Sequence, residues 1–292
     1  MPKSKKYIIA CSGGPDSMAL LDQYQKDIVG ICHVNYHFRK SANRDMKIVS
    51  DYAKKHKIPL YIKEVNPNVY KKTKFNFESW ARYVRYDFFV EAAKKAKCHD
   101  ILMAHHLDDW LETAVMQHDR HSQTTYYGIK ENNKYKSVNI YRPFINLRKA
   151  ELICYCKTHK IKYGEDETNF DTKYTRNKIR IKIAKLNDAQ FLECVKGFMV
   201  LNNDLLKLED LAYKGYQRWK ESKYYIPFLL KAKPEVQREL IYKLISEYSP
   251  KRMSLNKIEG LLDFIKSAKG NISYRLCNNV RVYKKNKYLK II

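Results

Sequence analysis

The residues whose types and spacing best suit a chemical role form a glycine turn near the amino end. The segment Ser12–Ser17 reads Ser-Gly-Gly-Pro-Asp-Ser and lies between two apolar runs, Tyr7–Cys11 and Met18–Leu21. The first run is typical of a buried strand and the second of the first turn of a helix. A strand that turns directly into a helix aims free backbone N–H groups and the positive end of the helix dipole at one point, which suits an anion.

We expect this turn to bind the phosphates of ATP. The predicted phosphate-binding residues are Ser12, Gly13, Gly14, Pro15, Asp16 and Ser17. The turn lacks the Lys-Ser/Thr ending of the Walker loop, so it suits the pyrophosphate end of ATP in an enzyme that attacks the α-phosphate and forms an adenylate. A tight glycine turn capped by Ser or Asp is the structural alternative. Six consecutive residues that suit an anion, placed directly after a predicted strand, favour phosphate binding.

A second cluster, which reads Ala-His-His-Leu-Asp-Asp-Trp-Leu-Glu-Thr, begins at residue 104. If a helix begins near Leu107, Asp108 and Glu112 are i, i+4 neighbours, and Asp109 lies beside them. These carboxylates could hold Mg²⁺ on ATP or the ammonium group of an amine substrate. The alternative is that Asp108 and Asp109 only cap the helix. The HExxH pattern is absent, so zinc-dependent hydrolysis is not expected.

Two further segments are rich in arginine. Arg82 and Arg85 lie one turn apart on a predicted helix. The guanidinium of arginine is suited to bidentate binding of phosphate or carboxylate. The acidic stretch 163–169 precedes a basic stretch at 174–180. Solvated helix faces and a surface loop explain both segments without any function. A loop that closes over ATP and RNA, with Arg176 on a phosphate, explains the second one equally well.

The elements that must position these residues alternate between strand and helix. Strands are predicted at 7–11, 28–35, 60–65 and 100–104, and helices at 44–57, 77–97 and 107–118. This alternation indicates an α/β fold with a doubly wound parallel sheet. Ligands of such folds bind at the carboxyl ends of the strands. The glycine turn, His33-Val34-Asn35 and His105-His106 all fall there.

The pattern changes near residue 186. Helices are predicted at 191–220, 234–248 and 254–265, followed by short strands at 272–276, 280–283 and 288–292. We therefore expect two domains, an α/β domain over 1–185 and a mostly helical domain over 186–292 that ends in a small β meander. The polar segment 126–135 is expected to form a mobile loop.

Composition narrows the choice of partner. The 292 residues include 57 Lys plus Arg and 31 Asp plus Glu, a net charge of +26. Such an excess implies a polyanion, and nucleic acid is favoured over a membrane because no basic amphipathic stretch is evident. No apolar run approaches the roughly 18 residues that span a bilayer. The seven cysteines are scattered without metal-site spacing, which is typical of reduced thiols in a cytoplasmic protein.

Taken together, these segments resemble the tRNA(Ile)-lysidine synthetases, a family of PP-loop ATP pyrophosphatases with an adenine nucleotide alpha hydrolase-like fold. The matching positions are Ser12–Ser17, His33–Asn35, Glu78 with Arg82, Arg85 and Tyr86, Ala104–Thr113, Arg142-Pro143 with Arg148, and Asp166–Asn169 with Arg176, Asn177 and Arg180. The resemblance holds in order and spacing over residues 7–185. The chain departs from the family at Trp110, where Gln is usual, and at His118–Thr125, where a Gly-rich stretch is usual.

The resemblance implies an ATP-dependent ligase that joins lysine to C2 of the wobble cytidine in a tRNA(Ile) with a CAU anticodon. An adenylated tRNA is the intermediate, and the product carries lysidine, which changes codon and aminoacylation specificity from Met to Ile. The implied partners are this tRNA, free L-lysine and ATP with Mg²⁺, with no membrane, in the cytoplasm. Whether two copies form a homodimer stays open.

The resemblance also implies roles for residues. The catalytic candidates are Asp16, Asp108, Asp109, Glu112 and Arg176, of which Asp109 and Glu112 would hold lysine and Arg176 the adenylated intermediate. The candidates for substrate or RNA contact are His105, His106, Arg82, Arg85, Asn177 and Arg180. Asp16 and Asp108 are the candidate Mg²⁺ ligands.

Three other functions compete with this hypothesis. A PP-loop tRNA thiolase would use catalytic or cluster-bound cysteines, often in a CxxC pair, whereas the closest pair here is Cys154-x-Cys156. A non-enzymatic RNA-binding protein could keep ATP as a structural ligand. An amidotransferase-linked synthetase would need a glutaminase-like segment, which the chain lacks.

Overall fold

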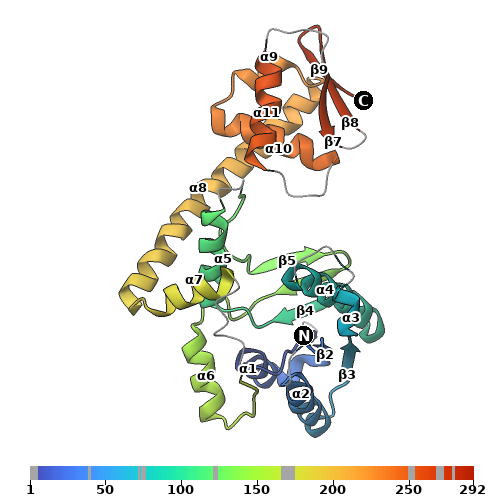
Figure 1. The fold of residues 1–292 in the computed structure, drawn as a ribbon, viewed down its shortest axis with the longest axis vertical. Helices are drawn as coiled ribbons and strands as arrows, with labels where there is room; N and C mark the ends of the chain where they lie inside the picture. The colour runs from blue at the N-terminus through green and yellow to red at the C-terminus, as the bar shows by residue number, and fades with distance from the viewer. Residues whose placement is uncertain are drawn as a thin grey trace, which may run out of the picture. The chain divides into compact units, whose positions relative to one another are not determined.

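The computed structural model describes residues 6–38, 41–71, 73, 77–120, 124–165, 175–248, 254–267, 273–277 and 280–292. The chain forms two compact units (Figure 1). The first comprises Met1–Glu112 and Ile129–Ile181, and the second comprises Thr113–Gly128 and Lys182–Ile292. Residues 113–128, which the sequence assigned to the first domain, therefore group with the carboxyl-terminal unit.

A six-stranded sheet forms the centre of the first unit. Its strands are β1 (Tyr7–Ala10), β2 (Ile28–Asn35), β3 (Leu60–Glu64), β4 (Asp100–Met103), β5 (Asn132–Tyr135) and β6 (Val138–Tyr141). They lie in the order β3-β2-β1-β4-β6-β5. All neighbouring pairs are parallel except β5 with β6, which are antiparallel. The predicted parallel sheet is confirmed.

Helices cover both faces of this sheet. The helices within residues 15–184 are α1 (Pro15–Gln23), α2 (Ala42–His56), α3 (Pro67–Lys71), α4 (Phe77–Ala96), α5 (Leu107–Asp119), α6 (Lys149–Thr158) and α7 (Thr175–Ala184), with a 3₁₀ turn at Gln25–Asp27. Successive strand residues point to opposite faces. Ile9 accordingly belongs to a core with residues of α1, α2 and α6, whereas Ile8 belongs to a core with residues of α4 (Figure 1). The predicted doubly wound α/β fold is confirmed.

The strand order places a topological switch point at β1. This strand has β2 on one side and β4 on the other, so the sheet continues from β2 to β3 in one direction and from β4 to β6 in the other. In open α/β sheets, this switch point is where ligands bind. The glycine turn follows β1, and His105-His106 follows β4.

The segment 126–135 differs from its expected loop structure. Residues 132–135 form β5, an edge strand paired with β6 from Asn132 opposite Tyr141 to Tyr135 opposite Val138. Its side chains are exposed or half-buried, so it carries no apolar alternation. Backbone hydrogen bonds to a neighbouring strand hold it, and periodicity cannot reveal such a strand.

The second unit contains a helical core and a small sheet. Its elements are α8 (Asp188–Glu221), α9 (Ile226–Leu230), α10 (Pro234–Tyr248), α11 (Leu255–Lys266), β7 (Ser273–Cys277), β8 (Val280–Lys285) and β9 (Tyr288–Ile291). The strands form an antiparallel meander in the order β7-β8-β9, as predicted. Trp219 is fully buried in the core, and Tyr216 packs beside it. Because both rings are buried in this core, neither is available to stack on an RNA base.

The buried residues of α8 include no leucine: they are Phe191, Val195, Asn202, Ala212, Tyr216 and Trp219. Leu201 and Leu211 are 43% and 59% exposed, whereas Asn202 is buried. The side chain of Asn202 accepts a hydrogen bond from Tyr127 N–H at 2.7 Å and donates one to Tyr127 O at 2.9 Å. A polar side chain thus joins this helix to the segment before Gly128. Among the helices described, none combines the length and apolarity that a bilayer span requires.

Candidate active site

Ser17 organises the glycine turn. Its buried Oγ accepts hydrogen bonds from the N–H groups of Ser12 and Gly13, both at 3.2 Å, and donates one to Gly14 O at 3.0 Å. Gly13 has a φ of +90°, which a residue with a side chain rarely adopts. Pro15 occupies the first turn of α1, where its fixed φ is suited to a helix start. The turn therefore keeps its shape through internal bonds.

Two other segments pack directly against the turn. Gly164 N–H donates to Gly13 O at 2.8 Å, and a Cβ on Gly13 would lie 2.9 Å from Asp45 O. A Cβ on Gly164 would overlap the buried carboxylate of Asp45. Arg44 fixes this junction, since its guanidinium donates to Asp45 Oδ1 at 3.0 Å and to Glu165 O at 2.7 Å. Sequence reasoning missed Asp45 and Gly164, because neither close approach leaves a local pattern.

His106 joins the loops that follow β1 and β4. Its Nε2 lies 3.7 Å from Asp16 Oδ2 and 3.4 Å from Asp109 Oδ2, and its Nδ1 lies 3.6 Å from Asp108 Oδ2. Burial by itself would lower the pKa of His106, but the hydrogen bonds to Asp108 and Asp16 and the charge of Asp109 raise this pKa to about 10. Three carboxylates therefore surround this ring, and together they favour its protonated form.

Asp16 keeps one oxygen available. Its Oδ1 is buried and has no hydrogen-bond partner within the described ranges. Within the same ranges, no three His, Cys, Asp or Glu side chains surround a point that could hold a metal ion. Mg²⁺ usually takes one or two carboxylates together with substrate phosphates, so a single orphaned oxygen beside the turn fits this ion when ATP brings it.

Asp108 faces α6. Its carboxylate accepts from Lys149 N–H at 2.9 Å and from Arg148 Nε at 3.3 Å. Burial would raise its pKa, but the contacts with His106, Lys149 N–H and Arg148 lower the pKa of Asp108 to about 2. Its charge is thus already balanced, and its place fits a clamp on α6 better than a metal ligand.

Glu112 contacts α7. Its side chain is 4% exposed and accepts from Arg176 Nε at 3.1 Å and from Arg180 Nε at 2.7 Å. Arg176 also donates to Glu78 Oε1 at 2.9 Å. Asp109 Oδ1 lies 3.8 Å from Arg176 Nη2. Burial raises the pKa of Asp109, while His106 and Arg176 oppose this rise.

His105 lies among arginines. Arg142 Nε donates to His105 Nδ1 at 3.3 Å. Burial first, and then the charges of Arg142, Arg85, Arg176 and Arg82, hold the pKa of His105 well below its usual range. Arg82 is exposed and lies over the Tyr86 ring at 4.4 Å.

The structure thus gathers most of the predicted site residues in the first unit. The glycine turn, Asp16, His106, Asp108 and Asp109 form one continuous set of contacts, and Asp109 continues to Glu112, Arg176 and Arg180. Asn177 is half-buried on α7. The predicted motif Asp166–Asn169 lies outside the described residues, as do 121–123 of the unusual segment after α5 and residue 272 of a predicted strand.

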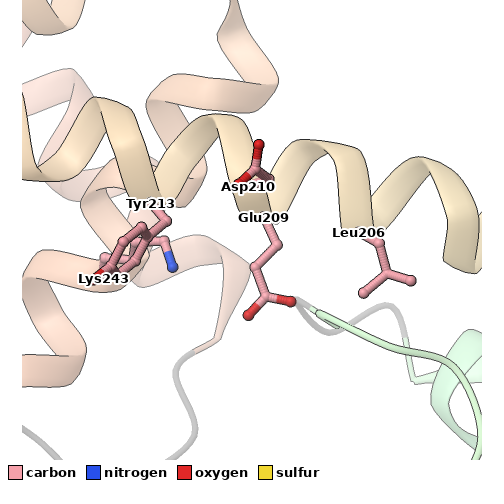
Figure 2. A pocket seen from close by; sticks show the side chains of 5 residues that line it. All are labelled: Leu206, Glu209, Asp210, Tyr213 and Lys243. Carbon is pink, nitrogen blue, oxygen red and sulfur yellow. The ribbon is translucent and has the colours of Figure 1, made fainter.

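A small surface hollow lies elsewhere, in the second unit (Figure 2). It measures about 270 Å³ and is lined by Leu206, Glu209, Asp210, Tyr213 and Lys243. Lys243 Nζ lies 5.7 Å from the centre of the Tyr213 ring. None of these residues belongs to the predicted site.

Comparisons with known proteins agree with this arrangement. A family model described as a PP-loop domain matches residues 2–187. A tRNA(Ile)-lysidine synthase from Ureaplasma parvum is 37% identical over 283 residues, covering 96% of this chain and 85% of that protein. A protein of the same name from Malacoplasma penetrans is 35% identical over 289 residues, covering 97% of each chain.

A solved structure shows a similar fold. It is that of a U34-tRNA thiolase from Methanococcus maripaludis with its [4Fe-4S] cluster, and it matches with a TM-score of 0.57. The match covers 68% of this chain and 73% of that one, at 17% identity. At this identity, the likeness shows the fold alone.

Proposed function

This chain belongs to the tRNA(Ile)-lysidine synthase family, and from this membership we propose its reaction. It is a ligase that forms a C–N bond between lysine and C2 of the wobble cytidine in a tRNA(Ile) with a CAU anticodon. ATP is consumed and leaves as AMP and pyrophosphate. The product, lysidine, changes the identity of the tRNA from Met to Ile.

The first step activates the base. The oxygen on C2 of cytidine attacks the α-phosphorus of ATP, and pyrophosphate leaves with the bonding electrons. The glycine turn supports this step, because its backbone N–H groups lie at the amino end of α1, where negative charge is stabilised. Ser17 holds these groups in place through its bonds to Ser12 and Gly13.

The second step exchanges oxygen for nitrogen. A neutral amine of lysine attacks C2, and AMP leaves with the oxygen, so a base must first take a proton from the ammonium. We propose that Asp109 holds the lysine ammonium, because its carboxylate adjoins the glycine turn through His106, which contacts both Asp109 and Asp16. Glu112 keeps Arg176 and Arg180 in place rather than binding lysine, since both arginines already occupy its oxygens.

Mg²⁺ would offset charge on the leaving pyrophosphate when it is bound with ATP. Asp16 is its candidate ligand in this chain, because one of its carboxylate oxygens is buried without a partner in the described residues. His106 contacts both Asp16 and Asp109, so a positive charge on its ring would screen the repulsion between these two carboxylates.

The tRNA would be bound mainly through its phosphates. The net charge of +26 supports such binding, with an affinity that depends on salt. We further propose that the enzyme acts in the cytoplasm, since the described cysteines whose side chains are placed are free thiols. A homodimer is compatible with this reaction.

One observation carries this proposal. His106 Nε2 lies 3.7 Å from Asp16, so the phosphate-binding turn after β1 and the acidic helix after β4 form a single site. A site for ATP and a site for an amine thus adjoin at the switch point of the sheet.

Labelled lysine tests the reaction directly. The protein is incubated with ATP, labelled lysine and a CAU-anticodon tRNA(Ile) transcript, and we expect the label to enter the RNA stably with one pyrophosphate released for each lysine. A transcript with a UAU anticodon serves as the control and should stay unlabelled. Pyrophosphate release that does not depend on the tRNA, or a transcript that stays unlabelled, would contradict the proposal.

The thiolase alternative predicts that the cysteines are essential. Cys11 lies beside the turn, but it is buried, and burial raises the pKa of its thiol to about 11, which disfavours a reactive thiolate. Cys154 is exposed and Cys156 is buried. A variant without any of the seven cysteines should keep lysine ligation, whereas a thiolase would lose its activity.

A further inference from the structure

Arg142 is a buried arginine without an acidic partner in the described residues. It follows β6 and is 2% exposed. Its Nη1 donates to Lys130 O at 2.7 Å and to Asn133 Oδ1 at 2.6 Å, and its Nη2 donates to Tyr86 Oη at 3.4 Å. All of these acceptors are neutral, whereas buried arginines are nearly always paired with a carboxylate. Burial lowers the pKa of Arg142, but arginine stays charged in proteins.

The two bonds from Nη1 explain only part of this placement. They hold the hairpin of β5 and β6, a task that any neutral donor could fulfil. The Nε–H group instead points to His105 Nδ1, 3.3 Å away. A guanidinium can only donate, so Nδ1 must accept, and a ring nitrogen that accepts carries no proton. The proton of the neutral ring is then on Nε2.

The surroundings of His105 favour the same state. The charged groups that act on it are Arg142 after β6, Arg82 and Arg85 on α4, and Arg176 on α7. Together with burial, these four guanidiniums keep its pKa well below its usual range. The ring is partly exposed, and its Nε2 makes no hydrogen bond to any residue that the structure describes. The Nε2–H group is thus available to a ligand.

We propose that Arg142 is a positioning residue that holds His105 as the neutral Nε2–H tautomer, so that the ring presents one N–H donor to an oxygen of the bound substrate. This inference rests on the proposed function only for the identity of that substrate. It explains why the site contains a neutral donor beside His106, which is positively charged. It also assigns a task to the first arginine of the Arg-Pro segment that the sequence singled out.

Nitrogen NMR tests the tautomer in the wild-type protein, without activity. Two-bond ¹H–¹⁵N spectra separate the Nε2–H tautomer, the Nδ1–H tautomer and the protonated ring. The chain has nine histidines, and His105→Asn identifies the signal. We expect His105 to be neutral with its proton on Nε2 from pH 6 to pH 8, a range that spans the ordinary histidine pKa of about 6.5. A protonated ring at pH 7 or the Nδ1–H tautomer would overturn the proposal.

Substitution then tests the cause. In Arg142→Met the two ¹⁵N shifts of His105 should move toward each other, and protonation should begin at a higher pH. The matched control is Arg148→Met, which removes an arginine of the same segment that contacts Asp108 instead; there the His105 signal should stay unchanged. If Arg142→Met folds and leaves the His105 shifts unchanged, Arg142 is not the positioning residue.

Activity provides a second readout. Relative to wild type at the same pH, kcat/KM of Arg142→Met should fall about tenfold between pH 8 and pH 6, because a growing share of His105 becomes protonated. In the double variant Arg142→Met/His105→Asn, kcat/KM should no longer depend on pH more strongly than in the wild type, since Asn cannot titrate. A stronger pH dependence of kcat/KM that persists in the double variant would overturn the proposal. If His105 shows the expected tautomer but no lysine enters the tRNA, the reaction assigned above fails and the positioning role stands.

Discussion

The four acidic residues of the site differ in how far neighbouring positive charges and N–H donors already balance their carboxylates. Asp108 is balanced by His106, Arg148 and the N–H of Lys149. Glu112 is occupied by two arginines. Asp16 and Asp109 share the charge of His106, and Asp16 retains an oxygen without a partner in the described residues. Capacity for a new cation is therefore clearest at Asp16.

Ser17→Ala tests the turn at the scale of one hydroxyl. Removing Oγ leaves the N–H groups of Ser12 and Gly13 without their acceptor, so the backbone that we propose binds phosphate should lose its shape. We expect pyrophosphate release to fall about 100-fold, similar to the loss of one donor that stabilises a transition state. Binding of tRNA should be unchanged in a filter assay.

Ser50→Ala is the matched control for this variant. The Ser50 hydroxyl only donates to Met46 O within α2, so its loss should have little effect. If the two variants release pyrophosphate at the same rate, the hydroxyl of Ser17 does not organise the turn.

At the scale of elements, the first turns of α5 connect two helices that follow it in the chain. Asp108 holds the start of α6 through Lys149 N–H, and Glu112 holds α7 through Arg176 and Arg180. Carboxylates at a helix amino end are stabilised by the helix dipole. The same residue types thus serve both structure and chemistry.

Glu112→Gln should destabilise the first unit. It leaves the guanidiniums of Arg176 and Arg180 close together without the carboxylate that balances them. We expect the midpoint of thermal unfolding to fall by about 5–10 °C, because breaking one side of a mostly buried ion pair leaves uncompensated charge. Circular dichroism measures the transition.

Asp210→Asn provides the comparison, since Asp210 pairs with Lys214 at 2.7 Å on an exposed face. That variant should change the midpoint by no more than about 2 °C. Equal shifts in the two variants would show that Glu112 is not a structural clamp.

Gly164→Ala tests the junction of three segments. The added methyl would overlap Asp45, so the segment 163–165 must move away from the glycine turn. We expect ATP-dependent pyrophosphate release to fall about 100-fold, since small displacements of a catalytic loop are costly. The rate at saturating ATP and tRNA is the measurement.

Gly197→Ala is the matched control, because a Cβ at this position of α8 meets nothing within 4 Å. It should raise stability by about 0.5–1 kcal/mol and leave the rate unchanged. A Gly164→Ala enzyme as active as Gly197→Ala would mean that the junction does not support the turn.

At the scale of the whole molecule, we expect the charge of +26 to govern how the tRNA is bound. Phosphate contacts release counterions, so affinity should fall steeply with salt. For a surface that touches about six to ten phosphates, we expect a loss of about 10³-fold or more between 50 and 200 mM salt, measured by fluorescence anisotropy of labelled tRNA. Thermal unfolding at both salt concentrations controls for loss of structure. An affinity that does not depend on salt would exclude recognition through phosphates.

The sequence by itself determined the fold class and the motifs. The Ser12–Ser17 turn, the helix start at Leu107 and the Lys and Arg excess all depend on local spacing or on composition. The sequence did not reveal the antiparallel strand β5 or the buried face of α8, because long-range backbone pairing and a buried Asn202 leave no apolar periodicity.

Only the tertiary structure decided which partner each site residue meets. Asp108 and Glu112 lie four residues apart, yet Asp108 binds Arg148, 40 residues further on, and Glu112 binds Arg176, 64 residues further on. The Arg142–His105 contact joins residues 37 apart. Local spacing determines which side chains share a helix face, whereas the packing of helices against the sheet determines the charges that this face meets.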